Sequence, residues 1–365
     1  ATGGLAWYSD KKDTQKTELA DKKELEAAEP APVAEEPISA SLQIDNLRLE
    51  LGYALLPMIN GQGGERLTDQ IKGLRRQLAQ ELGFVLPSVR IQDNLQLGAN
   101  SYVIRVKEIA AGEGELRPNM FLIMDPRGDK IQLVGEETVE PTFGLPAMWV
   151  DESQKEEALF RGYTVVDAST VVTTHINHLI HMHAAELLGR QELQQLLDHL
   201  SVQSPKLVED LIPKLLPLST MQKILQNLLD ESVHIRDMRT IIDTLTEHAA
   251  QTQDATELTA IIRTALGRAI VEQSFPAGSE IQAMSLHHEL ENILIQVVQT
   301  GGKEGAGMEP GLADTLLKEA TLAAQQQEKL GLPIVLLVPG PIRLLLSRFL
   351  RRALPQLSVL SHSEI

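Results

Sequence analysis

Four of the ten histidines fall on one predicted helix near the middle of the chain, at His175, His178, His181 and His183. Imidazole is a common zinc ligand, so this segment first raises the hypothesis of a metal-dependent hydrolase. At about 100° per residue, the first three histidines step around the helix by about 60° each, and His183 lies on another side. Four ligands therefore cannot converge on one ion. The spacing favours polar positions on a half-exposed helix, with the hydrolase as the alternative.

Two other segments resemble catalytic motifs but fail on spacing. The stretch Gly301–Gly307 is rich in glycine, yet Lys303 is followed by Glu304, whereas a phosphate-binding loop requires serine or threonine after its lysine. The segment His287–Glu291 lacks the second histidine of a zinc protease motif. We therefore expect no bound cofactor and no enzymatic activity.

A third candidate is a cluster of arginines on one predicted helix near the end of the chain. A basic helix can contact phosphates, but a net charge of -17 repels nucleic acid. A solvated or partner-facing helix side is favoured for these residues, and no nucleic acid partner is expected. They are Arg343, Arg348, Arg351 and Arg352.

Composition limits the remaining possibilities. The 365 residues are 43% hydrophobic but only 3% aromatic, so leucine, isoleucine, valine and alanine must fill the cores of more than one domain. The chain has no cysteine, which excludes disulfides and thiolate chemistry and is typical of a reducing compartment. No run of eighteen apolar residues occurs, but Ala1–Tyr8 followed by Lys11 and Lys12 is typical of the cytoplasmic end of a membrane helix.

Periodicity predicts the elements that would carry these residues. Leu47–Leu51 alternates as a strand does, and Leu67–Leu82 shows the three- and four-residue spacing of an amphipathic helix. Two more strands are expected at 88–91 and 101–109, the latter offering Tyr102 as its aromatic residue. Strand, helix, strand, strand is the order of a ferredoxin-like or RNA-recognition-like (RRM-like) domain, which needs one further helix. The histidine helix, capped by Asp167 or Ser169, would supply it.

Later segments alternate between helical and mixed patterns. Strands at 120–124, 147–150 and 163–166 flank an extended loop at 138–146 and a helix at 151–160. Four or five helices follow from 191 to 274, one of them starting with a Ser219/Gln222 capping box. A strand at 281–286 and helices at 289–300 and 312–329 come next. The pattern ends with a strand at 333–338, a helix with Pro341 at its first position and a strand at 358–361, for which parallel pairing is expected.

The fold class is thus a multidomain α+β chain, interpreted as a fragment whose C-terminal end is truncated. We expect an RRM-like or ferredoxin-like discontinuous domain that carries an inserted small α/β domain. In chain order, the predicted domains are a flexible linker after a membrane region at 1–45, subdomain 1 at 46–116 plus 168–188, subdomain 2 at 117–167, a helical subdomain 3 at 189–273 and an α/β subdomain 4 at 274–365.

Eight stretches, in order along the chain, together resemble the cytoplasmic C-terminal domains of the FHIPEP (FlhA/InvA/YscV) family of type III export-gate proteins. They are Leu49–Pro57, Val89–Asn94, Glu137–Trp149, Gly162–Glu186, Ile235–Arg239, Leu266–Ile270, Glu309–Ala313 and Leu354–Ser361. The linker matches the family only in character, since its tryptophan is absent and Ile38 or Leu42 stands there instead.

The resemblance implies a docking platform of the flagellar protein export gate, or alternatively the equivalent component of a virulence injectisome. It implies a nonameric ring at the cytoplasmic face of the inner membrane, attached through a multi-pass N-terminal half. The implied partners are export chaperones carrying filament-type substrates, the ATPase complex and the substrate-specificity switch protein.

The resemblance also implies a chaperone-binding cleft between the first and second subdomains. The family's (D/E)PxF loop matches Glu140, Pro141 and Phe143, and its threonine on the following helix matches Thr174. Val166 and Val171 match the floor of the cleft. Without the resemblance, burial of Phe143 in its own subdomain is the favoured alternative, because most apolar residues lie in a core.

Overall fold

The computed structural model describes residues 44–60, 66–275, 280–301 and 308–365. Nearly all of the predicted linker and most of the glycine-rich segment at 301–307 lie outside these residues. The chain divides into two units, Ala1–Asp45 and Asn46–Ile365, and all elements named from here on belong to the second.

The first sheet is mixed and holds the strands β1 (Leu47–Leu51), β2 (Val89–Asp93), β3 (Ser101–Val106) and β4 (Ile109–Glu115), in the order β2-β1-β3-β4. The short helices η2 (Tyr53–Leu55) and α2 (Leu56–Asn60) follow β1, and α3 (Leu67–Leu82) has the predicted bounds. Five apolar residues of α3 are buried at helical spacing, because they cover the leucines of β1: Leu67, Ile71, Leu74, Leu78 and Leu82.

The predicted ferredoxin-like strand order is wrong. That order places the third strand between the first and the second, whereas here β1 and β2 are direct parallel neighbours with Leu49 opposite Ile91. The place beside β3 that this order gives to β2 is taken by β4. A two-residue hairpin at Lys107 and Glu108, whose φ angles are +48° and +69°, joins β3 to β4. It returns the chain at once as β4, and neither residue is the glycine or asparagine that usually marks such a turn.

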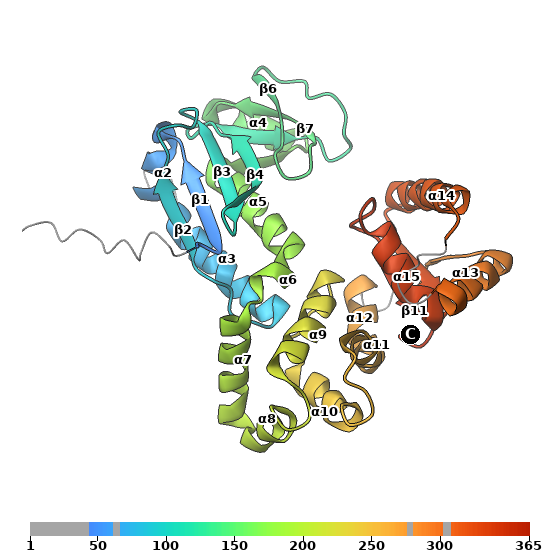
Figure 1. Ribbon diagram of the computed structural model, residues 1–365. Helices are drawn as coiled ribbons and strands as arrows, with labels where there is room; N and C mark the ends of the chain where they lie inside the picture. Colours follow the sequence, from blue (N-terminus) through green and yellow to red (C-terminus); the bar gives the residue numbers. More distant parts are fainter. Residues whose placement is uncertain (1–43, 61–65, 276–279, 302–307) are drawn as a thin grey trace, which may run out of the picture. The chain divides into compact units, whose positions relative to one another are not determined.

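Helix α5 (Ala168–Met182) is the predicted histidine helix, and it continues into the short α6 (Ala184–Leu187). It packs beside α3 near the first sheet, as Figure 1 shows, and it also contacts β5 and β8 of the second sheet. Asp167 occupies its N-cap position, and the Asp167 carboxylate accepts hydrogen bonds from the hydroxyls of Ser169 and Thr170.

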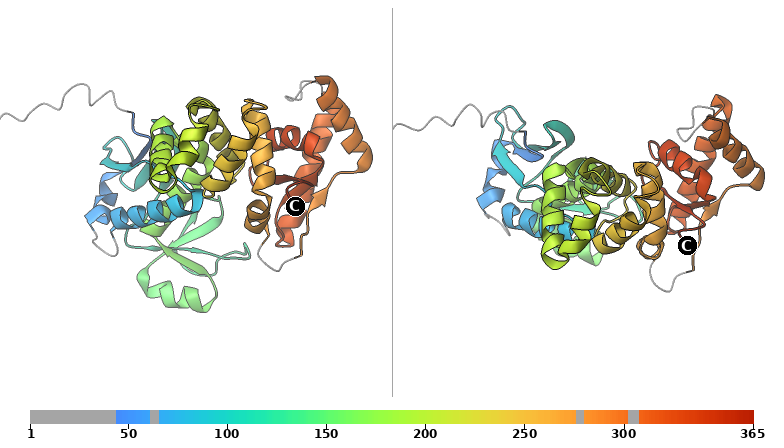
Figure 2. Two further views of the ribbon diagram at one scale, coloured as in Figure 1. Left: turned by 90° about the horizontal axis from the view of Figure 1, so that it is seen from below. Right: turned by 60° about the horizontal axis from the view of Figure 1, so that its bottom comes forward.

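The second sheet is antiparallel and holds β5 (Phe121–Met124), β6 (Glu136–Val139), β7 (Pro146–Val150) and β8 (Thr164–Asp167), in the order β6-β7-β5-β8. The helices η3 (Glu152–Gln154) and α4 (Lys155–Phe160) connect β7 to β8, and α4 lies against β8 (Figure 2). A small core belongs to this sheet alone, with Ile123, Met148, Val150, Ala158 and Tyr163 buried together.

Six helices follow between Arg190 and Ser274, a stretch that the structure describes throughout. They are α7 (Arg190–Gln203), α8 (Pro205–Leu211), α9 (Leu218–Asp230), α10 (Met238–His248), α11 (Ala255–Ala265) and α12 (Gly267–Ser274). The predicted capping box at Ser219 is wrong, because Pro217 is the N-cap residue and no side-chain cap bond occurs at this described helix end.

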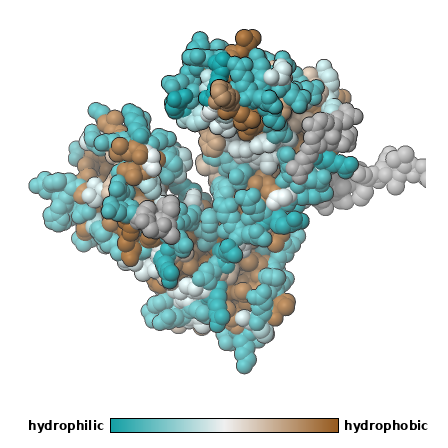
Figure 3. Space-filling view, turned by 180° about the vertical axis from the view of Figure 1, so that it is seen from behind, coloured by the Kyte–Doolittle hydropathy of each residue, from teal (hydrophilic) through white to brown (hydrophobic). Residues whose placement is uncertain are grey.

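The last elements are β9 (Met284–Ser285), α13 (His288–Gly301), α14 (Pro310–Lys329), β10 (Val335–Val338), α15 (Gly340–Leu350) and β11 (Ser358–Ser361). The strand order is β11-β10-β9, and both pairs are parallel, so the predicted parallel pairing is confirmed. The mixed α+β class is also confirmed, whereas the boundaries of the individual domains stay a prediction. One face of the molecule carries its apolar side chains in small separate patches among hydrophilic ones (Figure 3).

The C-terminus of α3 gives a test of the packing. Gly83 has φ +95°, and a Cβ there would lie 2.4 Å from the backbone nitrogen of Arg236. We expect Gly83→Ala to lower the free energy of unfolding by more than about 1–2 kcal/mol, because the left-handed backbone and the overlap both disfavour it. Gly73→Ala, within the same helix, should raise that free energy by about 0.5–1 kcal/mol, since beyond its chain neighbours and the backbone of its own helix no described atom lies within 4 Å of the added Cβ. Urea unfolding of both variants checks this, and equal shifts would contradict it.

Candidate protein-binding site

The loop between β6 and β7 is closed by hydrogen bonds that centre on Glu140. Its carboxylate Oε1 accepts from the backbone N–H of Thr142 at 3.0 Å, and Oε2 accepts from that of Phe143 at 2.7 Å. The backbone N–H of Glu140 donates to the Leu145 carbonyl at 2.9 Å, and the N–H of Gly144 donates to the Glu140 carbonyl at 3.0 Å. Gly144 has φ +69°, a conformation suited to glycine. Residues 140–145 thus form a defined bend.

Phe143 projects from this bend rather than into a core. Its side chain is 62% exposed, so the alternative that it packs inside its own subdomain is wrong. The described contact of its ring is with the imidazole of His178, at 5.4 Å between ring centroids and an interplanar angle of 66°. This edge-to-face geometry is a favourable arrangement for two rings. An apolar side chain is thereby held at the surface beside α5.

The other predicted site residues lie at different depths. Glu140 is buried, with 4% of its surface exposed, and Val171 is buried at 2%. Pro141, Val166 and Thr174 are half-buried. Val171, Thr174 and His178 follow each other at three- and four-residue steps, which places them on one face of α5. Val171 therefore contributes to the shape beneath this face, and Thr174 and His178 contribute to its surface.

His175 lies beneath the same surface and makes a buried polar contact. Its Nδ1 forms a hydrogen bond of 2.8 Å with the hydroxyl of Tyr102 on β3, and both residues are less than 5% exposed. On the other side, a Cβ added at Gly112 of β4 would lie 2.5 Å from His175 Nε2. Tyr102 thus faces α5 from inside, so it is unable to stack on nucleic acid bases.

Burial perturbs both partners of this pair. It lowers the pKa of His175, an effect that the charge of Glu140 opposes and His178 reinforces. Burial also raises the pKa of Tyr102 above its usual range, and the charge of Glu140 adds to that rise. His175 is therefore neutral at pH 7, and the carboxylate in the loop is close enough to act on both groups.

The three histidines of α5, and His183 directly after it, have separate partners. His181 faces Glu81 at 3.6 Å, His183 contacts Glu186 at 3.0 Å, and the other two contact Tyr102 and Phe143. Among the residues that the structure describes, no group of three histidine, aspartate or glutamate side chains could hold a metal ion. The spacing of these histidines favoured polar positions on a half-exposed helix over a metal site, but the contact of His178 with Phe143 was not predicted. Its position four residues after Thr174, on the same face, is the signal that could have indicated it.

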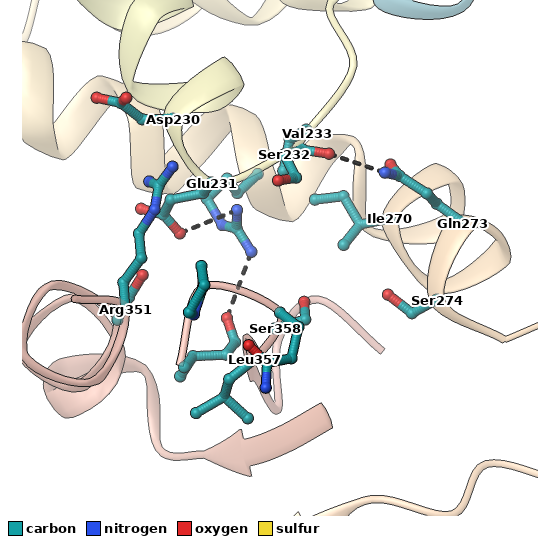
Figure 4. Close-up of a pocket in the computed structure, with 15 residues that line it drawn as sticks. Asp230, Glu231, Ser232, Val233, Ile270, Gln273, Ser274, Arg351, Leu357 and Ser358 are labelled. Atoms are coloured by element: carbon teal, nitrogen blue, oxygen red, sulfur yellow. Dashed lines mark hydrogen bonds and ion pairs between the residues drawn. The ribbon is translucent and has the colours of Figure 1, made fainter. Parts of the chain in front are cut away.

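A concavity of about 190 Å³ lies elsewhere, between α9, α12 and the segment 355–359 (Figure 4). Two of the charged residues that line it, Glu231 and Arg263, are held in ion pairs. The guanidinium of Arg263 lies 2.8 Å from the Glu364 carboxylate and 3.2 Å from that of Glu231, which also receives hydrogen bonds from Arg343. Burial acts to raise the pKa of Glu231, but Arg263 and Arg343 outweigh it and hold that pKa below its ordinary value. The ion pairs at this concavity therefore connect α11, α15, the C-terminal end of α9 and the last residues of the chain.

The predicted exposure of Arg343 is wrong. The sequence places it on a solvated or partner-facing helix side, but it is only 4% exposed and binds Glu231. The reason is the pair of carboxylates on other elements, which offset the cost of burying a guanidinium. The sequence of one helix cannot predict ion pairs with acidic residues that are distant along the chain.

The chain belongs to the FHIPEP family, whose family model matches residues 1–365. The flagellar biosynthesis protein FlhA of Escherichia coli (strain K12) is 49% identical over 362 residues, which cover 99% of this chain and 51% of that protein. FlhA of Bacillus subtilis (strain 168) is 39% identical over 325 residues, covering 89% and 48%. The chain thus spans about half the length of these relatives. The family resemblance found in the sequence is confirmed.

Solved structures share the fold. The Chlamydia pneumoniae CdsV protein, in its complex with CdsO, matches with a TM-score of 0.76 and 25% identity, covering 88% of this chain and 96% of that chain. The nonameric EscV cytosolic domain from the type III secretion system matches with a TM-score of 0.66 and 22% identity, covering 88% and 93%. Within residues 44–60, 66–275, 280–301 and 308–365, no helix is long and apolar enough to cross a membrane.

The buried His175 gives a test of pH dependence. Because its pKa in the folded state is lowered from 6.5, the unfolded chain binds protons more readily, and the free energy of unfolding should fall as pH drops below about 6.5. His175→Gln should make this fall shallower. Urea unfolding between pH 7 and pH 5 measures both slopes. His287→Gln, at an exposed histidine, is the control and should keep the parent slope; an unchanged slope in His175→Gln would refute the assignment.

Proposed function

We propose that this chain is a docking platform of the flagellar type III protein export gate, which binds export chaperone–substrate complexes through the loop 140–145 and the adjoining face of α5. The observation that carries the proposal is Phe143, a 62% exposed aromatic side chain on a bend held by four hydrogen bonds. Aromatic side chains on ordered backbone are typical anchors of protein interfaces, because little conformational freedom is lost when they bind.

The parts of the surface have distinct roles in this proposal. Phe143 enters an apolar pocket of the partner, and the hydroxyl of Thr174 on α5 meets a polar group beside it. Pro141 stiffens the bend through its fixed φ. Val166 and Val171 shape the surface from below, since Val166 is half-buried and Val171 is buried. A net charge of -17 favours partners with basic or neutral surfaces.

The comparisons support the flagellar assignment over an injectisome. Identity is 39–50% with the flagellar biosynthesis proteins of Bacillus subtilis, Escherichia coli and Salmonella typhimurium, against 22% with the EscV domain of a type III secretion system. A place at the cytoplasmic face of the inner membrane follows from this assignment.

Two features of the structural relatives support further partners. EscV is nonameric, so we include a homo-oligomeric ring of this chain in the proposal. CdsV is found bound to CdsO, which supports contacts with other proteins of the export apparatus, such as the ATPase complex and the substrate-specificity switch protein. The hydrolase alternative receives no such support, because the histidines at 175, 178, 181 and 183 have separate partners.

Replacing the anchor tests the proposal. Phe143→Ala should weaken binding of a purified flagellar chaperone–substrate complex at least about tenfold, or about 1.4 kcal/mol, because the apolar contact is lost. The fold should persist, since the ring is mostly exposed. Isothermal titration calorimetry gives both affinities.

The matched control is Phe160→Ala, at a phenylalanine of α4 that is 93% exposed and lies outside the proposed surface. It should bind like the parent chain. Equal affinities of Phe143→Ala and the parent would refute the assignment of this surface.

A further inference from the structure

Glu140 belongs to the part of the family motif that the sequence interpretation assigned to partner contact, yet its carboxylate is turned inward. Only 4% of the residue is exposed, and both carboxylate oxygens accept backbone hydrogen bonds from within the loop, at 3.0 Å and 2.7 Å. A carboxylate that is covered by its own loop, with both oxygens already hydrogen-bonded there, has little capacity to meet a group on another protein.

The two N–H groups that it binds belong to Thr142 and Phe143, the anchor itself. The backbone of Glu140 closes the same bend from the other side, through the Leu145 carbonyl and the Gly144 N–H. Hydrogen bonds to a charged acceptor are stronger than neutral ones. The position of the Phe143 backbone is therefore set by this one side chain and its own peptide groups.

The ring of Phe143 is fixed from a second direction. His178 lies at 5.4 Å between ring centroids, edge to face, and belongs to α5 rather than to the loop. Helix α5 is held in turn by the buried hydrogen bond between His175 and Tyr102 of β3. The exposed ring is thus oriented by two supports, a carboxylate at its backbone and an imidazole in edge-to-face contact with it.

We propose that Glu140 is a positioning residue that acts on partner binding through Phe143, with His178 as the second support of the ring, and that it makes no contact with the partner. This inference rests on the proposed function. Its physical basis is preorganisation: ordering a side chain during association costs affinity, and a bend that is ordered beforehand avoids that cost.

Hydrogen exchange of the free chain, without any partner, tests whether Glu140 orders the bend. Glu140→Gln removes the charge and one acceptor oxygen, so exchange of the Thr142 and Phe143 amides should accelerate at least about tenfold, as measured by NMR. Glu137→Gln removes one charge from the exposed part of β6 and should leave both rates unchanged. Glu140→Asp keeps the charge and should restore part of the protection. Equal rates in Glu140→Gln and the parent would overturn the positioning role.

A double-mutant cycle with a purified flagellar chaperone–substrate complex tests whether Glu140 acts on binding through Phe143. Glu140→Gln alone should weaken binding about 2- to 12-fold, the factor expected when one side chain must be ordered on binding. In the Phe143→Ala background the same change should have no further effect, because Glu140 acts through the ring. An independent, additive loss would show direct contact and overturn the inference. If Phe143→Ala itself binds normally, the proposed function fails, while the exchange rates still decide whether Glu140 orders the bend.

Discussion

Helix α5 packs against the first sheet through β4 and against the second through β5 and β8, while α3 lies along its side. Its apolar face is almost fully buried, with Val172, Ile176 and Ile180 at 1% exposure or less. A polar residue on such a face needs a partner, and the hydroxyl of Tyr102 supplies one to His175. Because the helix packs against both sheets, its remaining exposed face is held in a fixed place beside the loop that carries Phe143.

Charge connects this loop to the interior. The carboxylate of Glu140 accepts hydrogen bonds from two backbone N–H groups. Its charge also raises the pKa of Tyr102 and opposes the lowering of the pKa of His175. The loop, α5 and β3 are therefore coupled through one buried charge. A second buried network, of Arg263, Arg343, Glu231 and Glu364, joins α9, α11, α15 and the last residues of the chain. Removing one partner of such a buried network leaves an uncompensated charge, which is strongly destabilising.

Periodic elements were predictable from the sequence because burial alone sets their pattern. The bounds of α3 and β11 and the parallel pairing of β10 with β11 follow from apolar spacing and a proline at a helix start. The place of β4 beside β3 in the first sheet was not predictable, since it depends on a left-handed turn at Lys107 and Glu108. Within the candidate site, the resemblance pointed to Phe143, but the inward carboxylate of Glu140 and the support from His178 depend on the path of the backbone, which spacing does not encode.

The central claim is that the ring of Phe143 enters a partner protein, and fluorine NMR of the chain carrying 4-fluorophenylalanine at position 143 alone tests it most directly. On titration with a purified flagellar chaperone–substrate complex, the resonance should shift and broaden until the two proteins are equimolar, because the exposed ring becomes buried in the interface. A resonance that stays unchanged while sedimentation shows the complex to be formed would contradict the claim.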